Sequence, residues 1–78
     1  MSINFSISRY PKDSDSFDSS VDVTAVGADA WGELLGMAPE QLADVYPLTD
    51  VHAERVLRLT GIALDLETYE YFLEPSSG

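Results

Sequence analysis

Cysteine is absent from this 78-residue sequence. Its absence excludes disulfide bonds, thiolate metal sites and thiol catalysis, and a reducing cytoplasm is the expected location. Long hydrophobic runs are missing too, because the longest extend over only a few residues and a membrane helix needs ~20. The chain does not begin with a basic segment followed by an apolar core, so we expect neither a signal peptide nor a membrane partner.

Positive charge is also scarce. Four Lys and Arg residues stand against 14 Asp and Glu residues, which gives a formal net charge of −10 at pH 7. A surface of this sign repels nucleic acid and attracts basic proteins, whose encounter it accelerates. A plainer interpretation is that the charge only maintains solubility. The positions of the charges along the chain have to decide between the two interpretations.

Residues suited to catalysis are few. His52 is the only histidine, and it falls in the first turn of an expected helix, where a surface or capping role is the simpler interpretation. One histidine without cysteine does not make an ordinary zinc site, and the serines cluster in a loop and at the C-terminus rather than on a rigid element. The glycines are scattered and do not form a phosphate-binding loop. We therefore expect no catalytic residue, no metal site, no cofactor and no enzymatic activity.

Asp13 and Asp15 resemble the first two ligands of an EF-hand calcium loop. However, Phe17 occupies the third ligand position, and Asp18 stands where the loop requires glycine. Thr24 stands at the twelfth position, where the loop requires glutamate. The pattern therefore does not predict a calcium site.

Alternation of apolar and polar residues predicts strands at both ends of the chain. Residues 3–10 and residues 67–74 alternate in this way, and each segment is followed or ended by a proline, as is typical of a half-buried strand. Residues 12–20 are rich in Ser and Asp and are expected to form a loop. Residues 21–26 are expected to form a second short strand.

Helical spacing predicts helices between these strands. Apolar residues at helical spacing predict a helix over residues 28–35, with Trp31 in the core, and another over residues 50–60. Each is followed by a glycine suited to a helix C-terminus. Pro39 fits the first turn of a short helix over residues 39–43.

The order of these elements predicts one α+β domain over residues 1–75. It would consist of a small antiparallel sheet with two to three helices packed on one face. The first and last strands are expected to pair, because a lone strand at either end would leave its backbone groups without partners. Residues 76–78 are expected to form a disordered tail.

Two segments carry acidic charge that nearby bases do not offset. The helix over residues 50–60 is internally balanced, whereas residues 13–22 carry four aspartates beside Lys12 alone, and residues 65–74 carry four acids and no base. Carboxylates interleaved with aromatic residues are a plausible protein-binding surface. The predicted partner-binding residues are Glu67, Tyr69, Glu70, Tyr71, Phe72 and Glu74 of the C-terminal segment, with Asp13, Asp15 and Asp18 of the loop as second choice.

A structural interpretation competes for part of this set. Tyr69 and Tyr71 would lie on the same strand face and are more simply explained as core residues. Glu70 and Glu74 would lie on the opposite face with Phe72 between them. Like charges at this spacing solve no folding problem other than discouraging edge pairing, so this face is the stronger candidate.

Several segments of the second half carry a family resemblance. They are Val-Tyr-Pro-Leu-Thr at 45–49, a helix ending in Thr-Gly at 60–61, and Thr-Tyr-Glu-Tyr-Phe-Leu-Glu at 68–74. Together they resemble small bacterial proteins that look like immunity proteins encoded beside polymorphic toxins of bacterial competition. The resemblance covers about residues 31–74 and includes no catalytic motif.

The resemblance implies that the chain binds and neutralises a cognate toxin effector domain in the producing cell. Toxin domains that cleave nucleic acid are generally basic, so an acidic protein would block such a basic surface or active site. An alternative is an acidic nucleic-acid mimic that inhibits a nuclease or a DNA-binding protein, and a regulatory adaptor is a further one. The toxin's activity, the stoichiometry, the oligomeric state and the affinity do not follow from the sequence.

Overall fold

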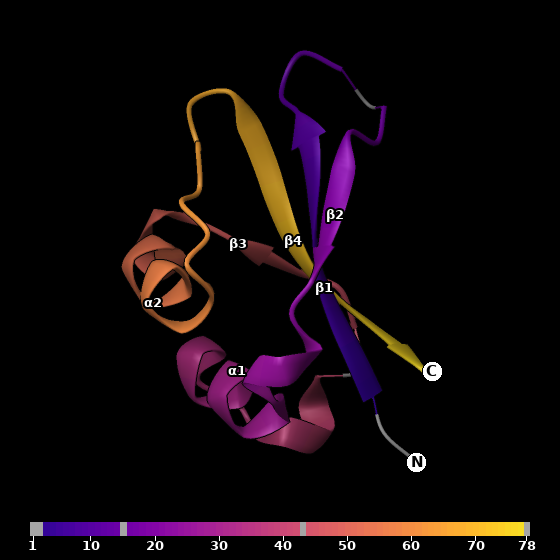
Figure 1. Ribbon diagram of the computed structural model, residues 1–78, viewed down its shortest axis with the longest axis vertical. Helices are drawn as coiled ribbons and strands as arrows, with labels where there is room; N and C mark the ends of the chain where they lie inside the picture. Colours follow the sequence, from indigo (N-terminus) through magenta and orange to yellow (C-terminus); the bar gives the residue numbers. More distant parts are fainter. Residues whose placement is uncertain (1–2, 15, 43, 78) are drawn as a thin grey trace.

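Over residues 3–14, 16–42 and 44–77, which the computed structural model describes, the chain folds into a four-stranded antiparallel sheet and two α-helices (Figure 1). The sheet order is β2-β1-β4-β3. The predicted α+β class, with a small antiparallel sheet, is confirmed. The strands are β1 (Ile3–Pro11), β2 (Ser19–Asp22), β3 (Tyr46–Leu48) and β4 (Tyr69–Ser77), and the helices are α1 (Ala28–Leu35) and α2 (Asp50–Thr60).

The two terminal strands form the centre of the sheet. β1 pairs with β4 over its whole length, from Ile3 opposite Ser77 to Pro11 opposite Tyr69, and so the predicted pairing of the first and last strands is confirmed. The predicted strand end at Pro75 is wrong, because β1 begins at Ile3 and offers backbone partners as far as Ser77. Of the predicted disordered tail, Ser76 and Ser77 therefore belong to β4, and Gly78 lies outside the described residues.

The second strand is shifted from its predicted position. β2 ends at Asp22, and a short 3-10 helix, Thr24–Val26, follows in place of further strand. The Asp22 carboxylate accepts hydrogen bonds from the Thr24 hydroxyl at 2.5 Å and from the Thr24 backbone N–H at 2.9 Å. Such local bonds offer the backbone an alternative to a strand ladder. The predicted helix over residues 39–43 is likewise a single 3-10 turn, Pro39–Gln41, and Ala43 lies outside the described residues.

Both predicted helices are confirmed, together with the glycines that end them. Gly36 and Gly61 adopt left-handed φ angles of 71° and 78°, which residues with a Cβ rarely adopt. At the start of α2, the backbone N–H of Thr49 donates to Nδ1 of His52 at 3.0 Å. The only histidine of the sequence therefore helps to cap a helix, as expected from its position.

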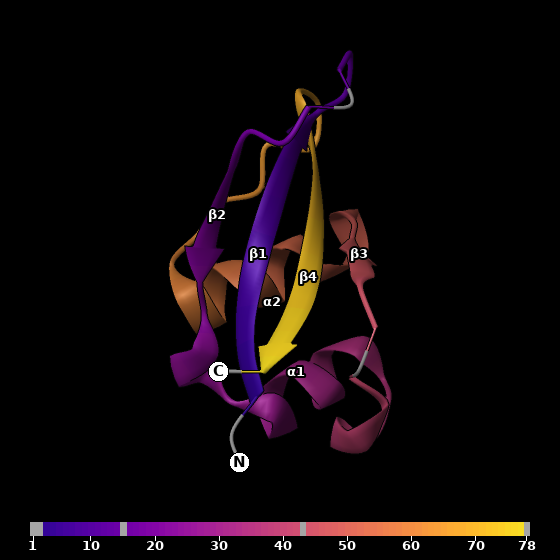
Figure 2. The ribbon, with the colours of Figure 1, turned by 90° about the vertical axis from the view of Figure 1, so that its right-hand side faces the viewer.

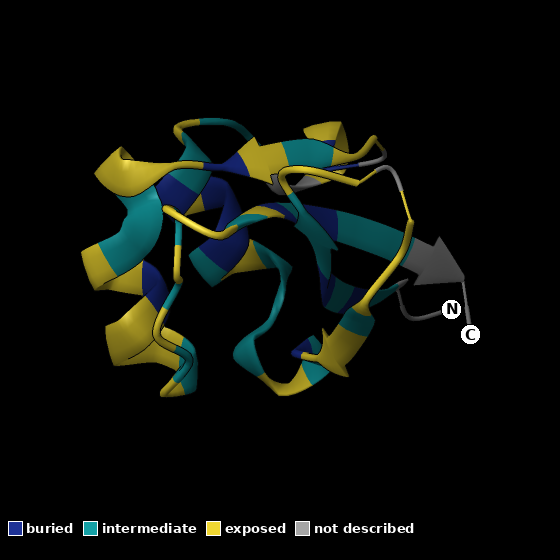
Figure 3. Ribbon diagram, turned by 90° about the horizontal axis from the view of Figure 1, so that it is seen from above, coloured by how far each residue is buried: buried dark blue, intermediate teal, exposed yellow. Residues whose placement is uncertain are grey.

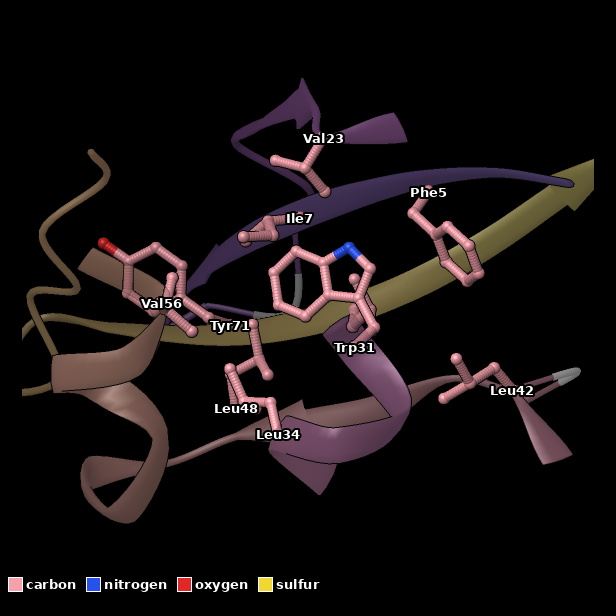
Figure 4. Close-up of a cluster of buried hydrophobic side chains, with 10 residues drawn as sticks. Phe5, Ile7, Val23, Trp31, Leu34, Leu42, Leu48, Val56 and Tyr71 are labelled. Atoms are coloured by element: carbon pink, nitrogen blue, oxygen red, sulfur yellow. The ribbon is translucent and has the colours of Figure 1, made fainter. Parts of the chain in front are cut away.

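The core lies between the helices and one face of the sheet. Trp31 of α1 is fully buried, and side chains from the sheet and from α2 gather around it (Figure 4). Seen along the molecule, buried segments concentrate toward the interior and exposed segments occupy loops and outer helix turns (Figure 3). The buried hydrophobic residues are Phe5, Ile7, Val23, Trp31, Leu34, Leu42, Leu48, Val56, Tyr71 and Leu73.

Candidate partner-binding surface

The sheet has two chemically different faces. Phe5 and Ile7 of β1 and Tyr71 and Leu73 of β4 belong to the core that the helices complete. Because side chains alternate along a strand, the residues between them point to the other side. In Figure 2 the strands lie in front and both helices lie behind them. We call the side without helices the open face. Its strand residues are Ser6, Ser8 and Tyr10 of β1, Ser20 and Asp22 of β2, Pro47 of β3, and Glu70, Phe72 and Glu74 of β4. Ser8 is buried among them, Ser6, Tyr10, Phe72 and Glu74 are half-buried, and the others are exposed.

Aromatic rings form the centre of the open face. Tyr10 packs edge-to-face against Phe72, with ring centroids 5.6 Å apart, and against Phe17 of the β1–β2 loop at 5.7 Å. The Phe17 side chain is 57% exposed. A shallow groove of about 300 Å³ lies beside these rings and is lined by Tyr10, Val45, Phe72 and Glu74. We call it the aromatic groove.

Carboxylates flank the rings. The register places Glu70 opposite Tyr10 and Glu74 opposite Ser6, so the two glutamates lie on either side of Phe72. Neither glutamate has an ion pair or side-chain hydrogen bond within the described ranges. The strand residues of the open face that the structure describes include no base, and Lys12 borders the face only beyond the end of β1, where it lines a pocket with Glu70.

Asp18, a predicted contact residue, is instead bound within the protein. Its Oδ2 accepts hydrogen bonds from Nε of Arg9 at 2.7 Å and from the Arg9 terminal nitrogen. These bonds hold the pKa of Asp18 below its ordinary value of 3.8, and the hydroxyl of Ser19 adds to the effect. The Arg9 guanidinium also lies 4.3 Å from the centroid of the Tyr69 ring. Asp18 and Tyr69 therefore hold an arginine of the chain itself, on the side of the sheet opposite Tyr10.

Tyr71 is not available to a partner. It is 6% exposed and belongs to the core, and its hydroxyl accepts a hydrogen bond from the backbone N–H of Asp65 at 3.1 Å. The interpretation of Tyr71 as a core residue is thus confirmed. Its hydroxyl helps to hold the turn that leads into β4.

The two remaining acidic candidates lie at one end of the sheet. The backbone N–H of Lys12 donates to the carbonyl of Thr68 at 3.0 Å, which joins the loop after β1 to the turn before β4. Asp13 and Glu67 are neighbours of these two residues in the sequence, and both are exposed. The two predicted segments therefore meet at the top of the molecule in Figure 1. Asp15 lies outside the described residues.

Sequence reasoning missed the aromatic part of the surface. Tyr10 points to the same side of its strand as Ser6 and Ser8. The predicted pairing of the terminal strands also implied that it would lie near the last strand. Its approach to Phe72 depends on the register, which nothing in the sequence specified. Phe17 and Val45 come from segments without regular structure, and no periodic signal pointed to them.

The described residues include neither a metal-binding cluster nor a membrane-spanning helix. Within the part of the chain that the structure describes, no group of three His, Asp or Glu side chains is arranged to hold a metal ion. Over the same ranges, none of the helices combines the length and hydrophobicity that crossing a bilayer requires.

Comparison with known protein families gives one match. A family model described as a domain of unknown function (DUF7683) matches residues 4–74. The chain belongs to this family. The match runs from β1 into β4, and so it includes the whole helical layer and the strand residues that make up the open face. Neither the curated proteins nor the solved structures contain a match to the chain.

Proposed function

We propose that the protein is an immunity protein that binds a cognate bacterial toxin domain and neutralises it by covering a basic surface with its open face. One observation carries the proposal. The open face presents the Phe72 ring between Glu70 and Glu74, with the Tyr10 ring packed against it, and the described residues of its strands supply no base to offset these charges.

The open face combines the two components that a tight protein interface needs. The half-buried rings of Phe72 and Tyr10 and the exposed ring of Phe17 provide rigid area for anchoring contacts. Carboxylates on the same face pair with partner arginines or lysines, and the net charge of −10 accelerates the encounter with a basic protein. Among the described residues, Glu70 and Glu74 form no side-chain hydrogen bond or ion pair, whereas Asp18 and Asp22 do.

The distribution of charge favours a protein partner over imitation of nucleic acid. A nucleic-acid mimic would spread a track of acids over much of its surface. In this protein α2 carries Arg55 and Arg58 on exposed positions, and Arg58 pairs with Glu54 at 2.6 Å. Glu70 and Glu74 lie on the open face without an ion pair among the described residues, and further exposed acids, such as Asp29 and Glu33, lie on α1. The resemblance of residues 31–74 to immunity proteins supports a toxin as the partner.

Neutralisation in cells tests the proposal. The proposal predicts that a toxin domain is encoded next to this gene. That domain is expressed under an inducible promoter together with the wild-type chain, the open-face variant Glu70→Gln/Glu74→Gln, or the control variant Asp29→Asn/Glu33→Gln. Both control positions are exposed on α1, and the two variants change the net charge equally. We expect the wild type and the control to protect growth, and the open-face variant to lose most of its protection.

Two outcomes contradict the proposal. If the wild type neither protects growth nor retains the toxin domain on an affinity column, the protein is not the immunity partner. If the open-face variant is folded and protects as well as the control, the open face is not the contact surface. Folding of each variant is checked by circular dichroism and thermal unfolding.

A further inference from the structure

We infer that the aromatic groove is a receptor for one arginine side chain of the partner. The guanidinium would lie against the rings of Phe72 and Tyr10 and pair with the carboxylate of Glu74. This inference rests on the proposed function, because it names the chemical group that a partner inserts into the open face. The rings, the groove and an arginine site elsewhere in the same molecule support it, whereas the acids alone would not.

The groove has the shape and lining for such a side chain. Phe72 and Tyr10 meet at an interplanar angle of 77°, and an edge-to-face contact of this kind covers only one face of one of the two rings. Val45 forms an apolar wall, and Glu74 lines the same groove. The methylene stem of an arginine would contact the apolar lining while its guanidinium reaches the carboxylate.

The protein binds one of its own arginines by the same chemistry. Arg9 lies 4.3 Å from the centroid of the Tyr69 ring and donates to the carboxylate of Asp18. This site is complete, with a ring, a carboxylate and a guanidinium. The aromatic groove has the ring and the carboxylate, and the open-face strand residues described by the structure supply no guanidinium.

Arginine fits this groove better than other side chains. A planar guanidinium stacks on aromatic faces and donates two parallel hydrogen bonds to a carboxylate, whereas a lysine ammonium is a compact and strongly hydrated point charge. An apolar side chain in the groove would bury Glu74 without a partner, which is strongly unfavourable. The chemistry of the lining therefore selects a cation, and its aromatic part selects a planar one.

Three matched peptides test the inference. N-acetylated, C-amidated pentapeptides of sequence Gly-Ala-X-Ala-Gly, with arginine, lysine or citrulline at X, are titrated into isotope-labelled protein and followed by NMR. Citrulline keeps the planar shape but lacks the charge. We expect arginine to shift the ring signals of Phe72 and Tyr10 and the side-chain signal of Glu74, with lysine weaker and citrulline weakest.

Two variants measure separately how much the ring and the charge contribute to binding of the arginine peptide. Phe72→Leu keeps an apolar side chain and removes the ring, and Glu74→Gln removes the charge at nearly constant size. Each is expected to weaken arginine-peptide binding roughly fivefold, as expected for the loss of a cation–π contact or an exposed charge pair. Glu54→Gln on α2 removes the same charge at a distance from the groove and is expected to leave binding unchanged.

Failure of the arginine receptor can be distinguished from failure of the proposed immunity function. The inference is overturned if the arginine peptide shifts the NMR signals no more than the lysine or citrulline peptide does, or if the shifted signals lie outside the groove. It is also overturned if Phe72→Leu keeps an intact amide spectrum and binds the arginine peptide as well as the wild type does. If the wild type still neutralises its toxin in that case, the proposed function stands and only the arginine receptor fails. If arginine binds in the groove but the wild type does not neutralise the toxin, the receptor stands and the immunity function fails.

Discussion

The two faces of the sheet are built from the same strands and have opposite chemistry. On the covered face, Ile7 and Leu73 lie opposite each other beneath the helices. One residue along each strand, Ser8 lies opposite Phe72 on the open face. Because side chains alternate along a strand, one side of the sheet supplies the apolar core, and the other side carries residues that lie outside that core.

The acidic residues also differ in whether they have a partner within the protein. Arg9, on the side of the sheet away from the open face, is held by Asp18 and the Tyr69 ring. Asp22 lies on the open face, but its carboxylate accepts hydrogen bonds from Thr24. Glu70 and Glu74 have no comparable partner among the residues that the structure describes. Acids that stabilise the fold can thus be separated from acids that remain available to a partner.

The largest effect on stability is expected in the covered core. Trp31→Ala should lower the free energy of unfolding by about 3–5 kcal/mol, because Trp31 is fully buried and its removal leaves a large cavity. In a domain of this size such a loss is most of the stability. Chemical denaturation followed by circular dichroism measures it, and a change below about 1 kcal/mol would show that Trp31 does not hold the core together.

Trp31→Phe is the matched control. Among the described residues, the buried indole N–H of Trp31 has no hydrogen-bond acceptor, and a buried donor without an acceptor costs about 1–3 kcal/mol. Phenylalanine keeps an aromatic ring and removes this donor. We expect it to lose less than half as much stability as alanine does.

Adjacent residues of β4 allow the two faces to be compared directly. Leu73→Ala should cost about 2–5 kcal/mol, because Leu73 is 1% exposed in the core. Phe72→Ala should cost roughly 1 kcal/mol, mainly for the contact with Tyr10. Urea denaturation of both variants gives the two values, and equal losses would show that the open face also carries the fold.

A smaller effect is expected from the Arg9–Asp18 pair as the pH falls. The folded-state pKa of Asp18 lies below its ordinary value of 3.8 because Arg9 donates to the carboxylate. The stabilisation is therefore present above that value and is lost as the pH falls through the lower, folded-state pKa. The stability difference between the wild type and Asp18→Asn should be greatest at neutral pH and shrink below about pH 4.

Asp13→Asn is the control for net charge, because Asp13 is exposed in the same loop. Thermal unfolding of the three proteins between neutral and acidic pH gives the comparison. A difference between the wild type and Asp18→Asn that does not change with pH would show that the ion pair does not contribute to stability in solution.

Much of the fold was predictable because local signals and tertiary packing agree. Glycines ended both helices, alternation defined β1 and β4, and the helical spacing around Trp31 identified a core face. The end of β2 was not predictable, because the turn depends on hydrogen bonds between Asp22 and Thr24. The extension of β4 to Ser77 depends on where its partner strand begins.

The candidate surface was predictable in part for a related reason. Strand parity placed Glu70, Phe72 and Glu74 together on the face away from the core, and the register confirms that arrangement. The alternation of side chains along a strand does not show which distant residues come into contact, so the ion pair between Asp18 and Arg9 was not predicted. The same limit hid the approach of Tyr10 to Phe72.

Partner affinity measures directly whether the open face binds the partner while the helix-covered face maintains the fold. The partner retained by the tagged wild-type chain from its native host is purified, and its dissociation constant is measured by calorimetry for the wild type, Glu70→Gln/Glu74→Gln and Asp29→Asn/Glu33→Gln. If the open-face charges are buried against partner bases, we expect each lost pair to cost about 2–5 kcal/mol of binding, with unfolding unchanged. The control variant should bind like the wild type. An open-face variant that is folded and binds its partner as tightly as the control would contradict the account.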